Sequence, residues 1–247
     1  MQVVKLPHGL FVDGKLYNMA EIRGITGREQ NYLTNMELLK KGLHISKILA
    51  SCVLSLSTSD GDKLETPVSS VVDKLLTTDR YFLMVQVRRE SIGDKYNFQF
   101  KCRKCEKVTA YTQDLSVLEV TYAKDPRMEY EIVLPTEQKA VVKLPNGSDE
   151  KKVYDIVKNH GDTLATSMIG LTLKMLNEKP VTSDDLMNLC VRDSNFITER
   201  LEEYSSGIDE KLQFECPECG EKYEEPLPVG GIDFFIQPPK KKASTEI

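Results

Sequence analysis

The sequence predicts an α+β fold from three patterns that follow one another along the chain. Near the N-terminus, short apolar runs flank Asp13-Gly14, and this dipeptide between such runs is a strong β-hairpin signal. Apolar residues then recur at helical spacing over much of residues 45–92. A two-residue period returns in two later segments, each of which ends in a Cys-x-x-Cys pair.

The first 22 residues predict a β-hairpin with two turns. One turn is expected at Pro7-His8-Gly9 and the second at Asp13-Gly14. Thr26 predicts the cap of a following helix, because an acidic residue, Glu29, lies in its first turn.

Residues 24–93 predict a helical block. Besides the helix capped by Thr26, three helices are expected in it, over Ile45–Leu56, Val68–Leu76 and Asp79–Ser91. Gly93 ends the last of them, because glycine commonly follows a helix C-terminus. We therefore place an N-terminal unit, hairpin plus helical block, at residues 1–94.

Four of the six cysteines form two pairs, Cys102/Cys105 and Cys216/Cys219. Each pair follows a strand that carries its alternate apolar residues and its first cysteine on one face. One Cys-x-x-Cys knuckle supplies half of a tetrahedral zinc site, so two knuckles complete a four-thiolate shell. We predict one structural zinc ion per chain, bound by these four cysteines in a zinc ribbon.

The ribbon is expected to be split by a long insertion. Cys105 and Cys216 are 111 positions apart, whereas an uninterrupted ribbon needs about 15–20 residues between its pairs. Residues 95–115 and 210–236 would form the two halves, and residues 116–209 an inserted, mostly helical subdomain. The cost of closing such a loop grows slowly with its length. Residues 237–247 predict a flexible polar tail.

The insertion predicts two strands and four helices. The strands are expected at Glu129–Leu134 and Ala140–Leu144. The apolar stripes of the helices are Val153, Ile156 and Val157 before Gly161, then Leu164, Met168, Leu171 and Met175, then Leu186, Leu189 and Cys190 after a Ser183 cap, then Ile197, Leu201 and Tyr204.

Other uses of the cysteines are less consistent with the pattern. A thioredoxin-like redox site expects a single pair at the start of a helix. Structural disulfides are typical of secreted proteins, and the N-terminus of this sequence does not resemble a secretory signal. A catalytic zinc needs an open ligand position, which a four-thiolate shell lacks. Cys52 and Cys190 lie on apolar helix faces and are expected in the core.

Composition and motifs argue against several functions. The net charge is −5, whereas proteins that wrap duplex DNA are usually basic. No apolar run reaches the roughly 18 residues of a membrane-spanning helix. Phosphate loops, dinucleotide fingerprints, nucleophile elbows and zinc-protease motifs are absent, and three scattered histidines, His8, His44 and His160, suggest structural roles. We therefore expect no catalytic residues and no bound cofactor other than zinc.

Two short stretches carry a family resemblance. Ile22-Arg23-Gly24-Ile25-Thr26-Gly27-Arg28-Glu29 is similar to a stretch of tailed-phage tail assembly proteins, and Phe214-Glu215-Cys216-Pro217-Glu218-Cys219 resembles a knuckle of small baseplate proteins. The order of features resembles the baseplate hub and tail assembly proteins of T-even-type contractile phages. This resemblance implies assembly or scaffolding with other phage tail or baseplate proteins, in the host cytoplasm during assembly or in the virion tail.

The sequence thus favours a non-enzymatic tail or baseplate component that acts by protein–protein contact, without membrane or nucleic acid. The alternative is a zinc-ribbon nucleic-acid-binding or transcription accessory protein. The alternative is favoured by Lys101, Arg103, Lys104 and Lys107 beside the first pair, and opposed by Glu215, Glu218, Glu221, Glu224 and Glu225 beside the second. Phe234 and Phe235, between glycines and prolines, must dock on the core or bind a partner.

Overall fold

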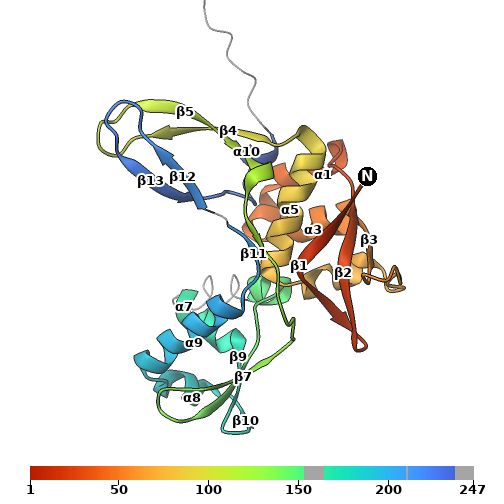
Figure 1. The fold of residues 1–247 in the computed structure, drawn as a ribbon, viewed down its shortest axis with the longest axis vertical. Coiled ribbons are helices and arrows are strands. Elements are labelled where there is room, and N and C mark those ends of the chain that lie inside the picture. The colour runs from red at the N-terminus through yellow and green to blue at the C-terminus, as the bar shows by residue number, and fades with distance from the viewer. Residues whose placement is uncertain (153–163, 210, 237–247) are drawn as a thin grey trace, which may run out of the picture.

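The computed structural model describes residues 1–152, 164–209 and 211–236, and its architecture is α+β (Figure 1). Three parts can be distinguished in it. The body (residues 1–94) surrounds a long helix, the ribbon (residues 95–115 and 211–227) projects as an arm, and the lobe (residues 128–152 and 164–204) lies at the opposite end.

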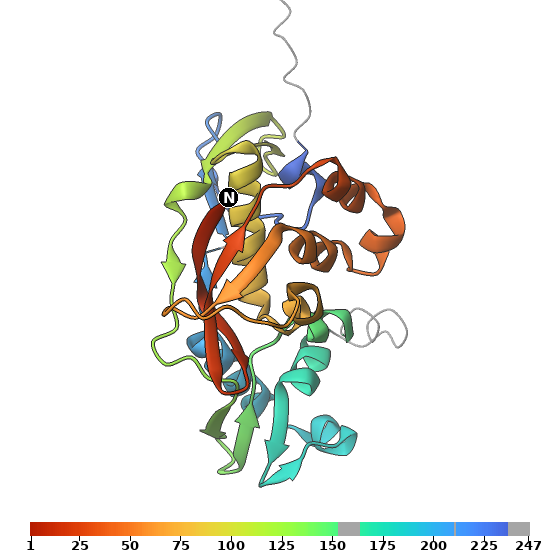
Figure 2. The same ribbon diagram turned by 90° about the vertical axis from the view of Figure 1, so that its right-hand side faces the viewer.

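In the body, a three-stranded antiparallel sheet packs against one long helix (Figure 2). The strands are β1 (Gln2–Val12), β2 (Lys15–Ile22) and β3 (Val53–Ser57). The helices are α1 (Gly27–Thr34), α2 (Met36–Lys40), α3 (His44–Cys52), α4 (Val68–Val71), the short 3-10 helix η1 (Val72–Lys74) and α5 (Thr77–Ile92). Helix α5 is buried on nearly all sides, as expected for a helix at the centre of a core.

The predicted turn at Asp13-Gly14 is confirmed, but the predicted turn at Pro7-His8-Gly9 is wrong. Strand β1 runs through these residues, with a shift in its pairing between Lys5 and Leu10. The buried carboxylate of Asp79 accepts the backbone N–H groups of His8 (2.9 Å) and Gly9 (2.8 Å). A side chain from α5 therefore satisfies the amides that the irregular strand leaves unpaired.

The predicted helix over Ile45–Leu56 is wrong beyond Cys52. Val53–Ser57 forms β3, which pairs with β2. A short apolar run fits helix and strand periodicity alike, and here the open edge of β2 decides between them. The stretch Val68–Leu76 is likewise shorter as a helix than predicted, because α4 ends at Val71 and η1 follows it.

Two predicted helix signals of the body are confirmed. Thr26 and Glu29 form a capping box at α1, and Gly93 ends α5 with a φ of 89°. Hydrogen bonds from Arg23 lower the pKa of Glu29 to about 2; those from Thr26 act in the same direction, and burial acts against them. The Arg23 and Glu29 side chains are 2.9 Å apart, so the cap is also an ion pair.

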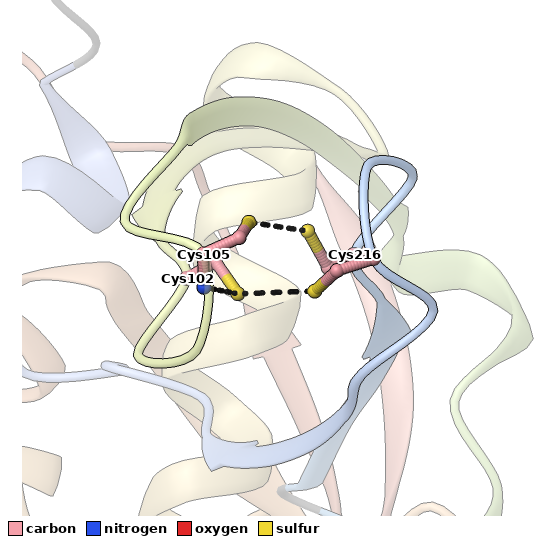
Figure 3. A group of neighbouring side chains, drawn as sticks. Cys102, Cys105 and Cys216 are labelled. Atoms are coloured by element: carbon pink, nitrogen blue, oxygen red, sulfur yellow. Dashed lines mark hydrogen bonds between the residues drawn. The ribbon is translucent and has the colours of Figure 1, made fainter.

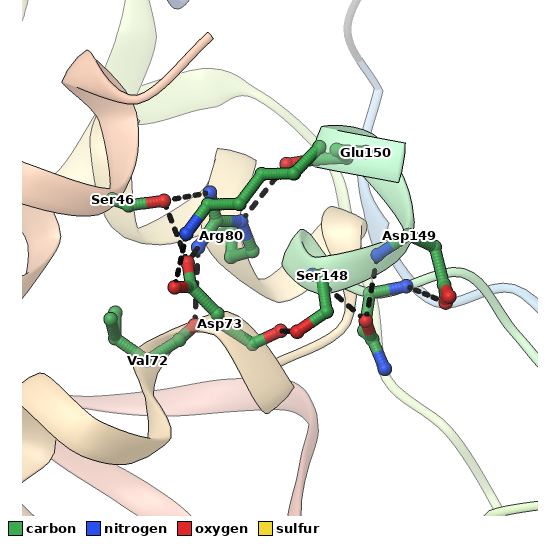
Figure 4. Close-up of polar contacts among 9 residues, drawn as sticks. Ser46, Val72, Asp73, Arg80, Ser148, Asp149 and Glu150 are labelled. Atoms are coloured by element: carbon green, nitrogen blue, oxygen red, sulfur yellow. Dashed lines mark hydrogen bonds and ion pairs between the residues drawn. The ribbon is translucent and has the colours of Figure 1, made fainter. Parts of the chain in front are cut away.

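A buried arginine, Arg80, joins the body to residues 147–150 of the insertion (Figure 4). Its guanidinium donates to the carboxylates of Asp73 and Glu150, both at 3.2 Å, and to the Ser46 hydroxyl at 3.1 Å. It also packs against Gly147, where an added Cβ would lie 2.5 Å from Arg80 Cζ. This charge tolerates burial because it is paired and hydrogen-bonded.

The lobe is built on a four-stranded antiparallel sheet in the order β10-β9-β8-β7. Its elements are β7 (Tyr130–Val133), β8 (Lys139–Val142), α7 (Leu164–Thr172), β9 (Leu173–Leu176), β10 (Lys179–Pro180), α8 (Ser183–Asn188) and α9 (Val191–Tyr204). Side chains of these helices and one sheet face form a second hydrophobic cluster, separate from that of the body. Two short strands, β6 (Val120–Thr121) and β11 (Gly207–Ile208), pair between lobe and body, after the 3-10 helix η2 (Leu115–Val117).

Both strands predicted in the insertion, and helix α9, are confirmed. Met175 lies on β9 and not on the helix predicted for it, and Thr182, not Ser183, caps α8. The prediction that both remaining cysteines are buried holds for Cys52 but is wrong for Cys190, which is exposed just before α9. The helix stripe before Gly161 and the tail after residue 236 lie outside the described residues.

Candidate metal centre

The ribbon consists of two antiparallel hairpins that come from distant parts of the chain. Strands β4 (Lys95–Lys101) and β5 (Val108–Asp114) form the first, and β12 (Lys211–Glu215) and β13 (Lys222–Pro226) the second. Each hairpin places one Cys-x-x-Cys pair in its connecting loop. The two loops meet at the tip of the arm (Figure 1).

The two loops have the same hydrogen-bond pattern. The Cys102 amide donates to the Lys107 carbonyl and the Cys216 amide to the Glu221 carbonyl, both at 2.8 Å. The residue after the second cysteine has a positive φ in both loops, 60° at Glu106 and 71° at Gly220. Glycine is the residue suited to that conformation. The sequence therefore indicated a positive φ only in the second loop, at Gly220, because a glutamate at position 106 does not predict one.

The four cysteine sulfurs all lie within 4.8 Å of one another (Figure 3). The sulfurs of Cys102 and Cys219 are 3.6 Å apart, and those of Cys105 and Cys216 are 3.7 Å apart. Four sulfurs that bind one zinc at about 2.3 Å occupy the corners of a tetrahedron with edges of about 3.8 Å. The structure therefore brings the four predicted residues together at a spacing that suits such an ion.

The electrostatics of the cluster also favour a cation. Burial raises the pKa of the Cys102 thiol, but hydrogen bonds from the Cys105 amide and the Tyr223 hydroxyl outweigh burial and lower it to about 6. The Glu221 amide favours a thiolate at Cys219, but burial and the neighbouring Cys102 sulfur outweigh that amide and raise the pKa of Cys219 to about 12. Four thiolates at this spacing require a positive charge between them.

A comparison with known protein families identifies the family of this chain. A family model described as T4 bacteriophage base plate protein matches residues 20–235. The chain belongs to this family. The matched range covers most of the body, the lobe and both halves of the ribbon, so this baseplate protein has all four cysteines within the family region. Searches of curated proteins and of solved structures found no match.

Membership in the family makes the chain a phage baseplate structural protein, a component of the virion tail that interacts with other tail or baseplate proteins. The α+β fold expected from the sequence is confirmed, and so is the resemblance to baseplate proteins. Among the described helices, none is long and apolar enough to span a bilayer.

Aromatic side chains fill the interior of the ribbon of this baseplate protein. The Phe214 ring lies 5.4 Å from Phe98, 5.0 Å from Phe100 and 4.6 Å from Tyr111, measured between ring centroids. Aromatic pairs at such distances stabilise beyond the area they bury. The rings continue the apolar stripe of the strands from the body toward the cysteines.

The segment after the ribbon docks on the core, which settles the alternatives left open for it. Helix α10 (Ile232–Phe235) buries Phe234 and Phe235 almost completely. Arg88 on α5 holds this junction, because its Nε donates to the Phe234 carbonyl (3.2 Å) and its Nη2 to the Lys95 carbonyl (2.6 Å). Sequence reasoning missed Arg88, since arginines in helices usually face solvent.

Three of the four basic side chains at the first loop are paired with acidic side chains. Arg103 pairs with Glu225 and Lys104 with Glu221 (2.8 Å), each across to the second hairpin. Lys101 is 3.7 Å from Glu106. Binding of nucleic acid depends on basic groups that are free to meet phosphates. The nucleic-acid alternative therefore gains no support from this surface.

Proposed function

We propose that this baseplate protein is a non-enzymatic structural or assembly component in which zinc joins the two halves of a split ribbon. The observation that carries the proposal is the approach of four sulfurs to within 4.8 Å from segments 111 positions apart. In this proposal Cys102, Cys105, Cys216 and Cys219 bind one zinc ion. Residues 95–115 and 210–236 then act as one unit, with residues 116–209 inserted between them.

A zinc ion in this shell would be structural. Four thiolates occupy all positions of a tetrahedral ion, which leaves none for water or substrate. Structural zinc supplies folding free energy, about 10–16 kcal/mol in small zinc domains. By joining the two loops, the ion would also hold the two ends of the insertion next to each other.

Several features support a role without catalysis. Asp79 has its pKa raised to about 6 by burial, a shift often seen in catalytic acids. Its carboxylate, however, is fully buried and accepts the amides of His8 and Gly9. The His8 ring is buried, and its Nε2 lies 3.2 Å from the Arg127 carbonyl. Both groups are thus used by the fold.

The protein would act by contact with other tail or baseplate proteins, in the host cytoplasm during assembly. Its negative net charge and paired basic side chains suit protein partners rather than nucleic acid. Co-expression with a phage tail-gene cluster tests this role. Recovery of defined baseplate proteins on the tagged chain is expected, whereas salt-sensitive recovery of nucleic acid or polymerase would favour the alternative.

The zinc is tested by metal analysis of the purified, reduced protein. We expect about one zinc per chain, and a clear loss of zinc when Cys102, Cys105, Cys216 or Cys219 is replaced by serine. Cys190→Ser is the matched control, because Cys190 is an exposed free cysteine outside the cluster. Freshly prepared protein without zinc, or with a different metal in its place, would refute the assignment.

A further inference from the structure

The sheet of the lobe has an open edge at β7. Strand β7 pairs with β8 on one side, and within the described residues no strand pairs with its other side. Figure 2 shows β7 at the margin of the lobe. Exposed edge strands are usually protected by lysine, proline or a bulge. Strand β7 reads Tyr130-Glu131-Ile132-Val133 and pairs with β8 without a bulge, so its protection consists of its short length and the charge of Glu131.

The backbone of β7 is oriented for a further strand. The Leu134 amide donates to the Gln138 carbonyl (2.9 Å) and the Glu137 amide to the Leu134 carbonyl (2.8 Å), which defines a three-residue hairpin loop. In antiparallel pairs, hydrogen-bonded and non-hydrogen-bonded residues alternate from such a loop. Ile132 therefore bonds to β8, whereas Glu131 and Val133 direct their N–H and C=O groups to the open edge.

The side chains of these two residues lie on the sheet face opposite the helices. That face has a hollow of about 530 Å³, lined among others by Glu131, Val133, Val141 and Met175. Val133 is 61% exposed. A second hollow, of about 860 Å³, adjoins the start of β7 and is lined by Tyr130 and Tyr204, among others. An added strand would thus find apolar contacts as well as backbone partners.

The charge beside the edge is acidic. Glu131 on the strand and Glu129 just before it have no ion-pair partner among the described residues. Other acidic groups nearby are neutralised, such as Asp125 by Arg127 and Glu203 by Arg200. Lys124, six positions before β7, is the basic group of the same hollow that forms no ion pair with a described residue. The strand itself therefore presents uncompensated carboxylates.

We propose that β7 accepts an extended segment of another baseplate or tail protein as a fifth strand of this sheet. On the sheet face that carries Glu131 and Val133, that segment would place an apolar side chain against Val133, Val141 and Met175 and, two positions along, a basic side chain that pairs with Glu131. A second copy of this chain is disfavoured as the occupant, because it would bring two acidic edges together. The inference rests on the proposed role in baseplate assembly, and names the surface and the chemistry of the partner.

The test uses labelled eight-residue peptides and fluorescence anisotropy. The first peptide repeats Val-Thr-Lys-Thr, so that valine and lysine alternate on one face of the strand; the second has glutamate in place of lysine, and the third is the first with alternate backbone nitrogens methylated. We expect the lysine peptide to bind and the other two to bind about tenfold more weakly or not at all. Binding should also slow amide exchange at Glu131 and Val133.

Two variants separate the contributions of backbone and charge. Val133→Pro removes the N–H at the open edge, which the β8 ladder does not use, and should abolish binding. Glu131→Lys should weaken the lysine peptide about tenfold and improve the glutamate peptide. Glu199→Lys, the same charge change at an exposed site on α9, is the control and should change neither. Circular dichroism confirms that each variant is folded.

Equal binding of the methylated peptide, or unchanged binding by folded Val133→Pro protein, would overturn strand addition. Self-association of the wild type in sedimentation, lost in Val133→Pro, would overturn the choice of partner. Zinc content should stay at one per chain in both edge variants, because β7 is not part of the ribbon. Failure of the peptide test would therefore leave the zinc proposal intact. Absence of zinc would likewise leave strand addition at β7 intact.

Discussion

The body and the ribbon share one hydrophobic cluster but are held together differently. Helix α5 of the body alone buries Phe82, Leu83, Met84, Val85 and Val87. The four ribbon strands bury Tyr96 and Leu212 close to the body, and further out their side chains are only partly covered. At the tip, the buried side chains are Cys102 and Cys216.

This difference shows where ordinary packing is sufficient and where it is not. A two-stranded hairpin is marginally stable at best on its own, and the ribbon consists of two of them. Its aromatic rings join the hairpins, but the tip lacks a core apart from sulfur. The body should therefore keep its structure without metal, and the ribbon tip should not.

Removal of the metal has the largest expected effect. A strong chelator should abolish amide protection in β4, β5, β12 and β13, because a structural zinc contributes about 10 kcal/mol to folding. Protection in α5 should persist. Hydrogen exchange measured before and after chelation checks this, with Cys216→Ser protein as a control in which the chelator changes nothing further. Unchanged exchange in the ribbon would mean that packing alone holds it.

A core substitution in the body should destabilise the body and leave the metal site of the ribbon intact. Leu83→Ala should lower the free energy of unfolding by about 2–5 kcal/mol, because Leu83 is fully buried and its loss leaves a cavity. The zinc content should remain one per chain. Urea unfolding and metal analysis measure the two quantities, and Leu54→Ala, at a partly exposed leucine, should cost about 1 kcal/mol or less. Zinc loss in Leu83→Ala would show that the two parts depend on each other.

Acid should destabilise the body through Glu29. The folded pKa of Glu29 is lowered to about 2 from an ordinary value of 4.5, so its contribution is fully present above pH 4.5 and is lost as the pH falls toward 2. Glu29→Gln should cost about 1–3 kcal/mol at pH 7 and flatten the stability curve between pH 4.5 and 2.

Urea unfolding across pH, followed by probes in the body, checks the Glu29 prediction. The exposed Glu65 provides the control variant Glu65→Gln, which should follow the wild-type curve. Because zinc ligands are also protonated at low pH, both variants are compared in the Cys216→Ser background. If the free energy of unfolding of Glu29→Gln protein falls with decreasing pH as steeply as that of the wild type, other groups cause the acid sensitivity.

The smallest expected effect distinguishes the two loops of the ribbon. Glu106→Gly should stabilise the ribbon by about 0.5–1 kcal/mol, because Glu106 has a φ of 60°. Gly220→Ala should destabilise it by about 1 kcal/mol, since its φ is 71°. Thermal unfolding of the zinc-loaded protein measures both changes. Glu218→Gly, at a position without positive φ, should not stabilise, and stabilisation there would contradict the conformational explanation.

Several features could be predicted from the sequence because their causes are local. The turn at Asp13-Gly14, the capping box of Thr26 and Glu29 and the end of α5 at Gly93 each depend on a few neighbouring residues. The four cysteines were identified as one group in the same way. A strand that ends in Cys-x-x-Cys predicts a knuckle, and two such knuckles predict that they meet.

Other features were decided by tertiary contacts between residues far apart in the chain. Val53–Ser57 forms a strand because it pairs with the free edge of β2. Strand β1 continues through Pro7 without a turn because the Asp79 carboxylate accepts the backbone N–H groups of His8 and Gly9. The burial of Arg80 and Arg88 depends in part on acceptors from distant segments, the Glu150 carboxylate for Arg80 and the Phe234 carbonyl for Arg88. Periodicity reports which face of an element is apolar, whereas the partner that covers that face is set only when the whole chain packs.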